Sequence, residues 1–169
     1  GGKDSMSGSF LDLDVPPTLI SFAIAPVEAG EVLTTEFKAA GHPVGLFAGN
    51  SAEELRASWE LMNGLARQGK VKAAWAVENG LAEAVMKMSF GNNIGFEAAD
   101  KELEWYLPCP GAVVAELTEL PDNPLCVPIG VTTYAADIDL GGDDRASIEK
   151  LRTLNEGVHL QHRSCFVRW

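Results

Sequence analysis

The chain has 169 residues, of which 46% are hydrophobic, and its 24 acidic residues outnumber the 13 lysines and arginines to give a net charge of -11. A chain of this length can bury a core without disulfides or metals, and its acidic balance argues against a general nucleic-acid surface, which needs a basic face. The longest apolar stretch, residues 19–27, is interrupted by a serine and a proline and is too short to cross a bilayer. The three cysteines show no close pairing, which is typical of proteins in the reducing cytoplasm. We therefore expect a cytoplasmic protein with no nucleic-acid or membrane partner.

The first half of the chain predicts an irregular segment, two strands and one helix. Residues 8–17 contain a proline pair that forbids a helix, so we expect an irregular connector. Apolar runs bounded by proline and glycine are typical of buried strands, here residues 18–25 and 43–48. Ser51 and Glu54 form a capping box that predicts a helix start, and Gly69 ends this helix. Its apolar residues recur at helical spacing: Leu55, Trp59, Met62, Leu65 and Ala66.

The second half predicts further strands and two more helices. Short apolar runs between glycine and proline turns predict strands at residues 71–77, 96–98, 112–117, 126–129 and 133–138. Apolar residues at i, i+3, i+4 and i+7 predict a helix over residues 81–91. A last helix is expected to be capped by Asp143 or Asp144 and to end at Gly157, and its expected inward residues are Ile148, Leu151 and Leu154. This irregular alternation predicts an α+β fold, a mixed sheet covered by about three helices.

The strongest chemical signal is the string GGKDSMS at residues 1–7. Glycines allow backbone amides to approach a phosphate, Lys3 adds positive charge, and hydroxyls such as that of Ser5 add donors. A plain polar turn explains the same string. The continuation is a poor helix former, which argues against the ATP pyrophosphatase loop, and the lysine stands too close to the glycines for a Walker loop. Because such a glycine-rich loop normally follows a strand, we expect the chain to be a piece of a longer protein.

Longer stretches resemble a family of nucleotide-using enzymes. GGKDSMSGSF, the following VPPTLISFAIAPVEAGEVLTTEFKAAGHPVGLF and the later KAAWAVENGLAEAVMKMSFGNNIGFE are similar to formylglycinamidine ribonucleotide (FGAM) synthase of purine biosynthesis, closest to its large single-chain type, over roughly residues 1–138. The resemblance implies a C-terminal-type domain of the aminoimidazole ribonucleotide (AIR) synthetase superfamily at residues 18–157. Residues 1–17 would be the loop and connector from a preceding ATP-binding domain, and residues 158–169 a tail that need not be native.

The resemblance also implies a reaction. ATP phosphorylates the formamide oxygen of formylglycinamide ribonucleotide (FGAR), and ammonia made from glutamine at a separate glutaminase domain displaces the phosphate. Gly2 and Lys3 would contact ATP and Ser5 the substrate, while the catalytic residues are not assigned. Lys3 stands where smaller relatives have a magnesium-binding asparagine, so we expect it to neutralise charge and not to ligate Mg²⁺. The expected partners are the small-molecule substrates and the ATP-binding and glutaminase domains of the parent chain, and we expect the isolated chain to be inactive.

The turn AVENG at residues 76–80 is a second candidate site. Many relatives read Asp-x-Ser-Asp-Gly-Gly here, whereas this chain has Ala76 in place of the magnesium-binding aspartate and Glu78 in place of the serine. Alanine cannot ligate a hard cation, so we expect a plain helix start with Glu78 at the positive end of the helix dipole, and no metal ligand. The family's glutamate-containing stretch is also missing at residues 107–112. The domain therefore resembles a degenerate copy, with the chemistry held elsewhere.

The remaining patterns in the sequence are weaker evidence for a function. His159, His162 and Cys165 have a zinc-like spacing without an evident fourth ligand, so a terminal strand or an added tail is the simpler interpretation. The four tryptophans are expected in the core or at interfaces. Two other functions stay open: a non-catalytic structural or dimer-forming domain, and another ATP-dependent member of the same superfamily, such as a selenophosphate synthetase or a thiamine-phosphate kinase.

Overall fold

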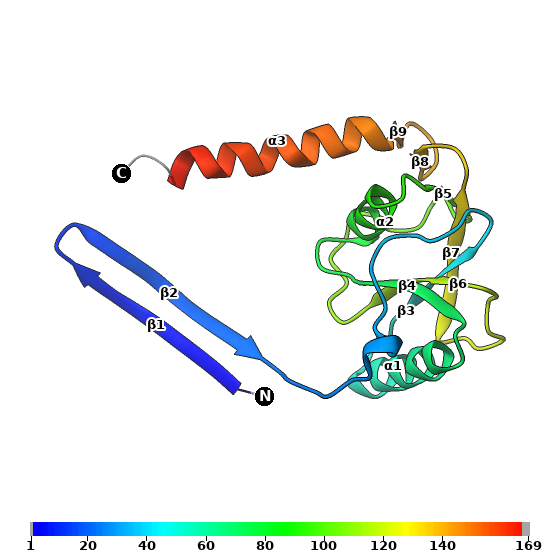
Figure 1. Cartoon of the computed structure of the whole chain (residues 1–169), viewed down its shortest axis with the longest axis horizontal. Coiled ribbons are helices and arrows are strands. Elements are labelled where there is room, and N and C mark those ends of the chain that lie inside the picture. The colour runs from blue at the N-terminus through cyan, green and yellow to red at the C-terminus, as the bar shows by residue number, and fades with distance from the viewer. Residues whose placement is uncertain (1, 167–169) are drawn as a thin grey trace. The chain divides into compact units, whose positions relative to one another are not determined.

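The computed structural model describes residues 2–166, apart from the side chains of residues 3, 10 and 158–166. It divides into two compact units, Gly1–Val32 and Leu33–Trp169. The first unit contains a β-hairpin and the short 3-10 helix η1 (Ala29–Glu31), and the second contains a seven-stranded sheet and three α-helices (Figure 1). The prediction of an α+β fold with a mixed sheet and three helices is confirmed by the second unit.

The hairpin replaces the loop and connector that the sequence predicted. Strand β1 (Gly2–Phe10) pairs antiparallel with β2 (Leu13–Phe22), and the turn between them contains Leu11 at φ 56°. The prolines are tolerated because both strands are edges, and the pairing skips Ser7, Pro16 and Pro17 where the register shifts. The expectation of an irregular segment at residues 8–17 was therefore wrong, and the strand expected at residues 18–25 begins earlier and ends at Phe22.

The hairpin has no core of its own. All ten residues of β2 are exposed, and apolar side chains on both strands share this exposure, among them Met6, Leu19, Ile20 and Phe22. An isolated two-stranded ribbon is marginally stable in water because it buries little apolar surface. The hairpin therefore needs a further strand or a packed surface to bury its apolar side chains.

The sheet of the second unit is mixed, with strand order β4-β6-β3-β7-β5-β8-β9. Its strands are β3 (Pro43–Phe47), β4 (Val71–Ala76), β5 (Gly95–Ala98), β6 (Val113–Leu117), β7 (Cys126–Thr133), β8 (Asp137–Asp139) and β9 (Arg145–Ser147). Neighbours are antiparallel except for β5 and β8, which are parallel. The strands expected at residues 126–129 and 133–138 were wrongly divided, because β7 continues to Thr133 in order to pair with the whole of β5.

Helices α1 (Ala52–Arg67) and α2 (Leu81–Phe90) contribute to two separate apolar clusters. Leu65 of α1 packs in one cluster with Phe47 and Leu117, and Met88 of α2 packs in the other with Phe96. The predicted cap of α1 is present, because Ser51 Oγ accepts from the Glu54 N–H. The return bond differs from the predicted capping box, since Glu54 Oε2 accepts from the N–H of Asn50, the residue before the cap. None of the helices among residues 2–166 has the length and apolar character needed to cross a membrane.

The last helix, α3 (Ile148–Phe166), differs from its prediction at both ends. Strand β9 lies between Asp144 and the helix, and Ser147 Oγ instead accepts from the Lys150 N–H at 3.3 Å. Leu154 is 59% exposed and Gly157 does not end the helix, so both expectations were wrong. The helix is held at its beginning by the buried Ile148 and by Arg152, which donates to the carbonyl of Phe90.

Two glycine-to-alanine changes should move stability in opposite directions. A Cβ on Gly95 would lie 1.9 Å from the carbonyl oxygen of Ala135, so Gly95→Ala should lower the free energy of unfolding by about 3 kcal/mol or more. A Cβ on Gly64, inside α1, meets nothing within 4 Å, so Gly64→Ala should raise it by about 0.5–1 kcal/mol. Urea unfolding followed by circular dichroism measures both; equal midpoints for the two variants would contradict the packing described around Gly95.

Candidate functional site

The start of the predicted phosphate cradle lies in paired strand. Gly2 stands opposite Phe22, and Lys3 stands opposite Ser21. A Cβ on Gly2 would lie 2.7 Å from Cζ of Phe22, so a larger residue here would require the half-exposed Phe22 ring to move. The side chain of Lys3 lies outside the described part of the chain. Gly2 therefore lies against the Phe22 ring in the paired strand.

Ser5 stands opposite Leu19 and is exposed. Its N–H donates to Oδ1 of Asp4 at 2.8 Å, which gives Asp4 a local role within the strand. A hollow of about 300 Å³ lies on the hairpin, lined by Ser5, Met6, Ser7, Pro17, Thr18 and Leu19. The hollow thus gathers three hydroxyl-bearing residues from both strands, and hydroxyl groups can donate to an anionic ligand.

The second candidate, residues 76–80, runs from the end of β4 to Gly80, the N-cap of α2. Gly80 has φ 122°, and a Cβ there would lie 2.8 Å from the carbonyl oxygen of Trp105, so this position requires glycine. The acid that serves the helix start is Glu83, whose Oε2 accepts from Asn79 Nδ2 at 2.8 Å and from the Asn79 N–H at 3.3 Å. The sequence singled out Glu78 for this role, but Glu78 is exposed and lies outside the first turn.

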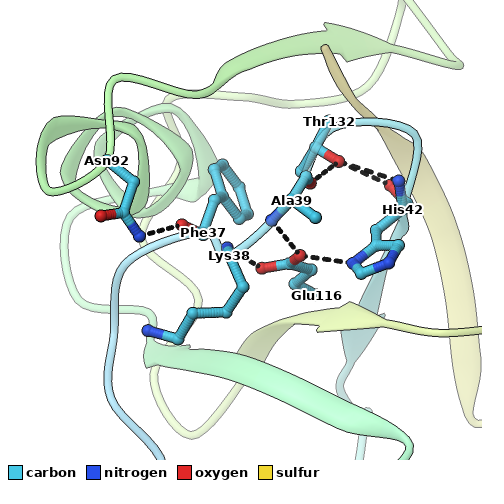
Figure 2. Close-up of polar contacts among 7 residues, drawn as sticks. All are labelled: Phe37, Lys38, Ala39, His42, Asn92, Glu116 and Thr132. Carbon is cyan, nitrogen blue, oxygen red and sulfur yellow. Dashed lines mark hydrogen bonds and ion pairs between the residues drawn. The ribbon is translucent and has the colours of Figure 1, made fainter. Parts of the chain in front are cut away.

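A buried carboxylate that sequence reasoning missed forms the densest polar cluster. Glu116 lies on β6 and is fully buried. Its carboxylate accepts from the backbone N–H of Lys38 at 2.6 Å and of Ala39 at 3.1 Å, and it contacts Nδ1 of His42 at 2.6 Å (Figure 2). Because a carboxylate only accepts, Nδ1 donates in this contact, which leaves Nε2 of the half-buried ring available. One side chain thus holds the segment 38–42 at three points.

Two further side chains hold the same segment. Thr132 Oγ1 accepts from the His42 N–H at 2.9 Å and lies 2.7 Å from the carbonyl oxygen of Ala39. Asn92 Nδ2 donates to the carbonyl oxygen of Phe37 at 2.7 Å (Figure 2). The segment therefore combines these side-chain hydrogen bonds with backbone bonds to β7, where the Gly41 N–H donates to the Thr132 carbonyl and the Thr132 N–H donates to the His42 carbonyl. The cluster therefore fixes the backbone of residues 37–42 and orients the imidazole ring of His42.

A faint signal for this anchor was present in the sequence. Glu116 is the acidic residue within the apolar run AVVAEL at residues 112–117, and a charged residue in a buried strand must find partners. Nothing in the sequence names those partners, because Lys38 and His42 lie more than seventy positions away in the chain.

The remaining candidates add no second site. Burial raises the pKa of the Cys126 thiol to about 11, so this cysteine is a poor nucleophile. Trp105 is buried against Phe96, as expected, whereas Trp59 is 45% exposed and donates to the carbonyl oxygen of Gly111. The side chains of the zinc-like set, residues 159, 162 and 165, lie outside the described residues.

Comparison with solved structures yields neighbours from Thermotoga maritima. PurLQS is similar with a TM-score of 0.59 and 10% identity over 74% of this chain and 28% of that chain. Phosphoribosylformylglycinamidine synthase II gives a TM-score of 0.60 at 10% identity with the same coverage. PurL complexed with ATP gives 0.60 at 9% identity, again over 74% of this chain and 28% of that one. No family model and no curated protein matches the sequence.

These similarities establish the fold. At 9–10% identity the shared property is the arrangement of the sheet and helices, and the chain spans about 28% of the length of each of these neighbours. The sequence predicted an α+β fold and resembled FGAM synthase. A solved structure of phosphoribosylformylglycinamidine synthase II has a similar fold.

Replacing Glu116 should strongly destabilise the second unit. Glutamine offers one acceptor oxygen, so its N–H₂ group must face either the Lys38 N–H, which donates to Oε2, or the Ala39 N–H, which donates to Oε1. We therefore expect Glu116→Gln to lower the free energy of unfolding by about 2–3 kcal/mol. The matched control is Glu119→Gln, which removes an exposed ion pair with Lys70 and should cost at most about 1 kcal/mol. Urea unfolding compares the two, and an equal loss in both variants would refute the anchor.

Proposed function

We propose that this chain is a segment of an ATP- and glutamine-dependent FGAM synthase, a cytoplasmic ligase that converts FGAR to formylglycinamidine ribonucleotide. The observation that carries the proposal is an agreement between two independent signals. The string at residues 1–7 and the later strand–helix stretch resemble this enzyme in sequence, and the fold is similar to that of FGAM synthase II. The neighbour PurL has been solved in complexes with ATP and with FGAR.

In this proposal the hairpin carries the ligand contacts. Gly2 and Lys3 approach ATP, and Ser5 donates to FGAR from the hydroxyl-lined hollow of the hairpin. Mg²⁺ is held by other domains of the parent, because Lys3 cannot ligate a cation and Ala76 offers no side-chain oxygen. The parent's ATP-binding and glutaminase domains complete the site. Phosphoryl transfer depends on positioned donors and cations, so the hairpin contributes only when those domains hold it.

A second candidate is a non-catalytic domain that serves assembly. The exposed apolar side chains of β1 and β2 favour it, because such side chains are typical of surfaces that pack against another domain. The two candidates differ in the role of the Ser5 hydroxyl. It binds FGAR if the chain belongs to the ligase, and it has no role if the domain serves only assembly.

The substitution Ser5→Ala in the parent enzyme tests this difference. We expect the free energy of FGAR use, measured as kcat/KM, to become less favourable by about 1–3 kcal/mol, the scale of one lost hydrogen bond to a charged group. Ser9→Ala is the matched control, because it removes a hydroxyl from the same strand that is bonded to Asp14. Unchanged kinetics in Ser5→Ala would remove the substrate role from this residue.

The isolated 169-residue chain should fold but catalyse nothing. The second unit has a buried core, whereas the hairpin lacks packed donors, so ATP should bind more weakly than about 1 mM, which corresponds to roughly -4 kcal/mol. Isothermal titration with ATP and Mg²⁺ measures this affinity, and a glutamine-dependent ADP-release assay measures turnover. Micromolar ATP binding or any turnover would mean that the chain itself holds a complete site.

The sequence of the parent gene tests the proposal most directly. We expect an acidic, metal-binding ATP domain encoded before residue 1 and a glutaminase domain with a cysteine–histidine pair encoded after residue 169. An open reading frame with neither domain would overturn the assignment.

A further inference from the structure

A pocket of about 450 Å³ lies between the start of α2, the β8–β9 hairpin and the first turns of α3. Its wall is formed by buried and half-buried apolar side chains, including Ala82, Met86, Ile138, Leu140 and Leu151. The volume lies in the range of pockets that hold small molecules. None of the residues assigned to ATP or FGAR lines it, so it is separate from the proposed FGAM synthase chemistry.

The polar residues of this pocket are mostly acidic. Glu83, Asp143 and Asp144 line it, and none of them forms an ion pair with a described cation. The pocket's cationic residue is Arg145, but its guanidinium is held by Asp137 at 2.6 Å and by Asp139 at 3.6 Å. The three carboxylates therefore present negative charge that no described neighbour neutralises.

One of these carboxylates, that of Glu83, is oriented by a neighbour. Glu83 Oε2 is held by Asn79, as described above, which leaves its second oxygen without a described hydrogen bond. Partial desolvation raises the pKa of Tyr106, and a hydrogen bond to Asp144 with its negative charge raises it further. The phenol therefore stays neutral at neutral pH, and both Tyr106 and Asp144 line the pocket.

These features define the chemistry of a ligand. Phosphates and carboxylates are repelled by the acidic residues, and an apolar wall favours a ligand with a hydrophobic body. A metal ion is disfavoured because the described residues contain no group of three or more His, Cys, Asp or Glu side chains arranged to hold one. We propose that this pocket binds a small organic cation, an ammonium group carried on an aromatic or branched alkyl body, with the ammonium beside Glu83 and Asp144.

Three probes of similar body and different charge test this proposal on the full chain. They are 2-phenylethylammonium, neutral 2-phenylethanol and anionic 3-phenylpropionate, titrated at low ionic strength and followed by protein-detected NMR. We expect the ammonium to bind most tightly and the carboxylate least. In the double variant Glu83→Gln/Asp144→Asn the affinity for the ammonium should fall about fivefold, and the affinity for the alcohol should not change. Circular dichroism checks that the variant is folded.

The matched control is the double variant Glu60→Gln/Asp122→Asn, which removes the same charge from exposed residues that do not line the pocket. It should leave the affinity for the ammonium within twofold of the unmodified chain. The proposal is overturned if the carboxylate probe binds as tightly as the ammonium, if both double variants weaken the ammonium equally, or if none of the three probes binds saturably. Because no probe is a nucleotide, failure here leaves the FGAM synthase proposal standing.

Discussion

The second unit depends on the burial of one carboxylate, that of Glu116. An ionised carboxylate removed from water costs several kcal/mol unless donors replace its hydration, and here the donors come from residues 38, 39 and 42, far away in the chain. The sheet around β6 and the segment before β3 must therefore form together, since either one alone leaves the charge or the amides unsatisfied. This coupling ties the irregular segment to the sheet, and the neighbouring Phe37 is buried in the apolar cluster that contains Met88 of α2.

The elements that the sequence predicted well are those specified by local physics. Helix α1 is determined by its N-terminal cap and apolar face, all within one short stretch, and the turn at Gly80 by a backbone conformation that only glycine adopts easily. The failures involve strand pairing and side-chain partners that local sequence patterns do not show. The proline pair of β2 is acceptable only because that strand is an edge, and the start of α3 is displaced because Arg145 and Ser147 pair with β8. The Glu116 anchor was missed for the same reason, because the sequence shows an acidic residue in an apolar strand but not the residues that bind it.

The hairpin changes how the glycine-rich string has to work in the proposed enzyme. A loop cradles phosphate with several converging backbone amides, whereas in an antiparallel strand successive amides point in opposite directions. Contacts to a ligand must then come from one free strand edge and from side chains on one face. Ser5 suits this arrangement, because its side chain lines the hollow on the hairpin, and Gly2 already has a packing partner in Phe22.

Charge separates the two proposed ligand sites. The chain carries a net charge of -11, so an anionic nucleotide is repelled over most of its surface and needs a local cation, which the string offers as Lys3. The pocket beside α2 has the opposite character, because its one arginine is neutralised by Asp137 and Asp139 while three carboxylates stay unpaired by described cations. A phosphate-bearing substrate of the proposed ligase is therefore disfavoured in that pocket, and an organic ammonium is disfavoured beside Lys3. Local charge thus assigns each proposed site a ligand of a different sign.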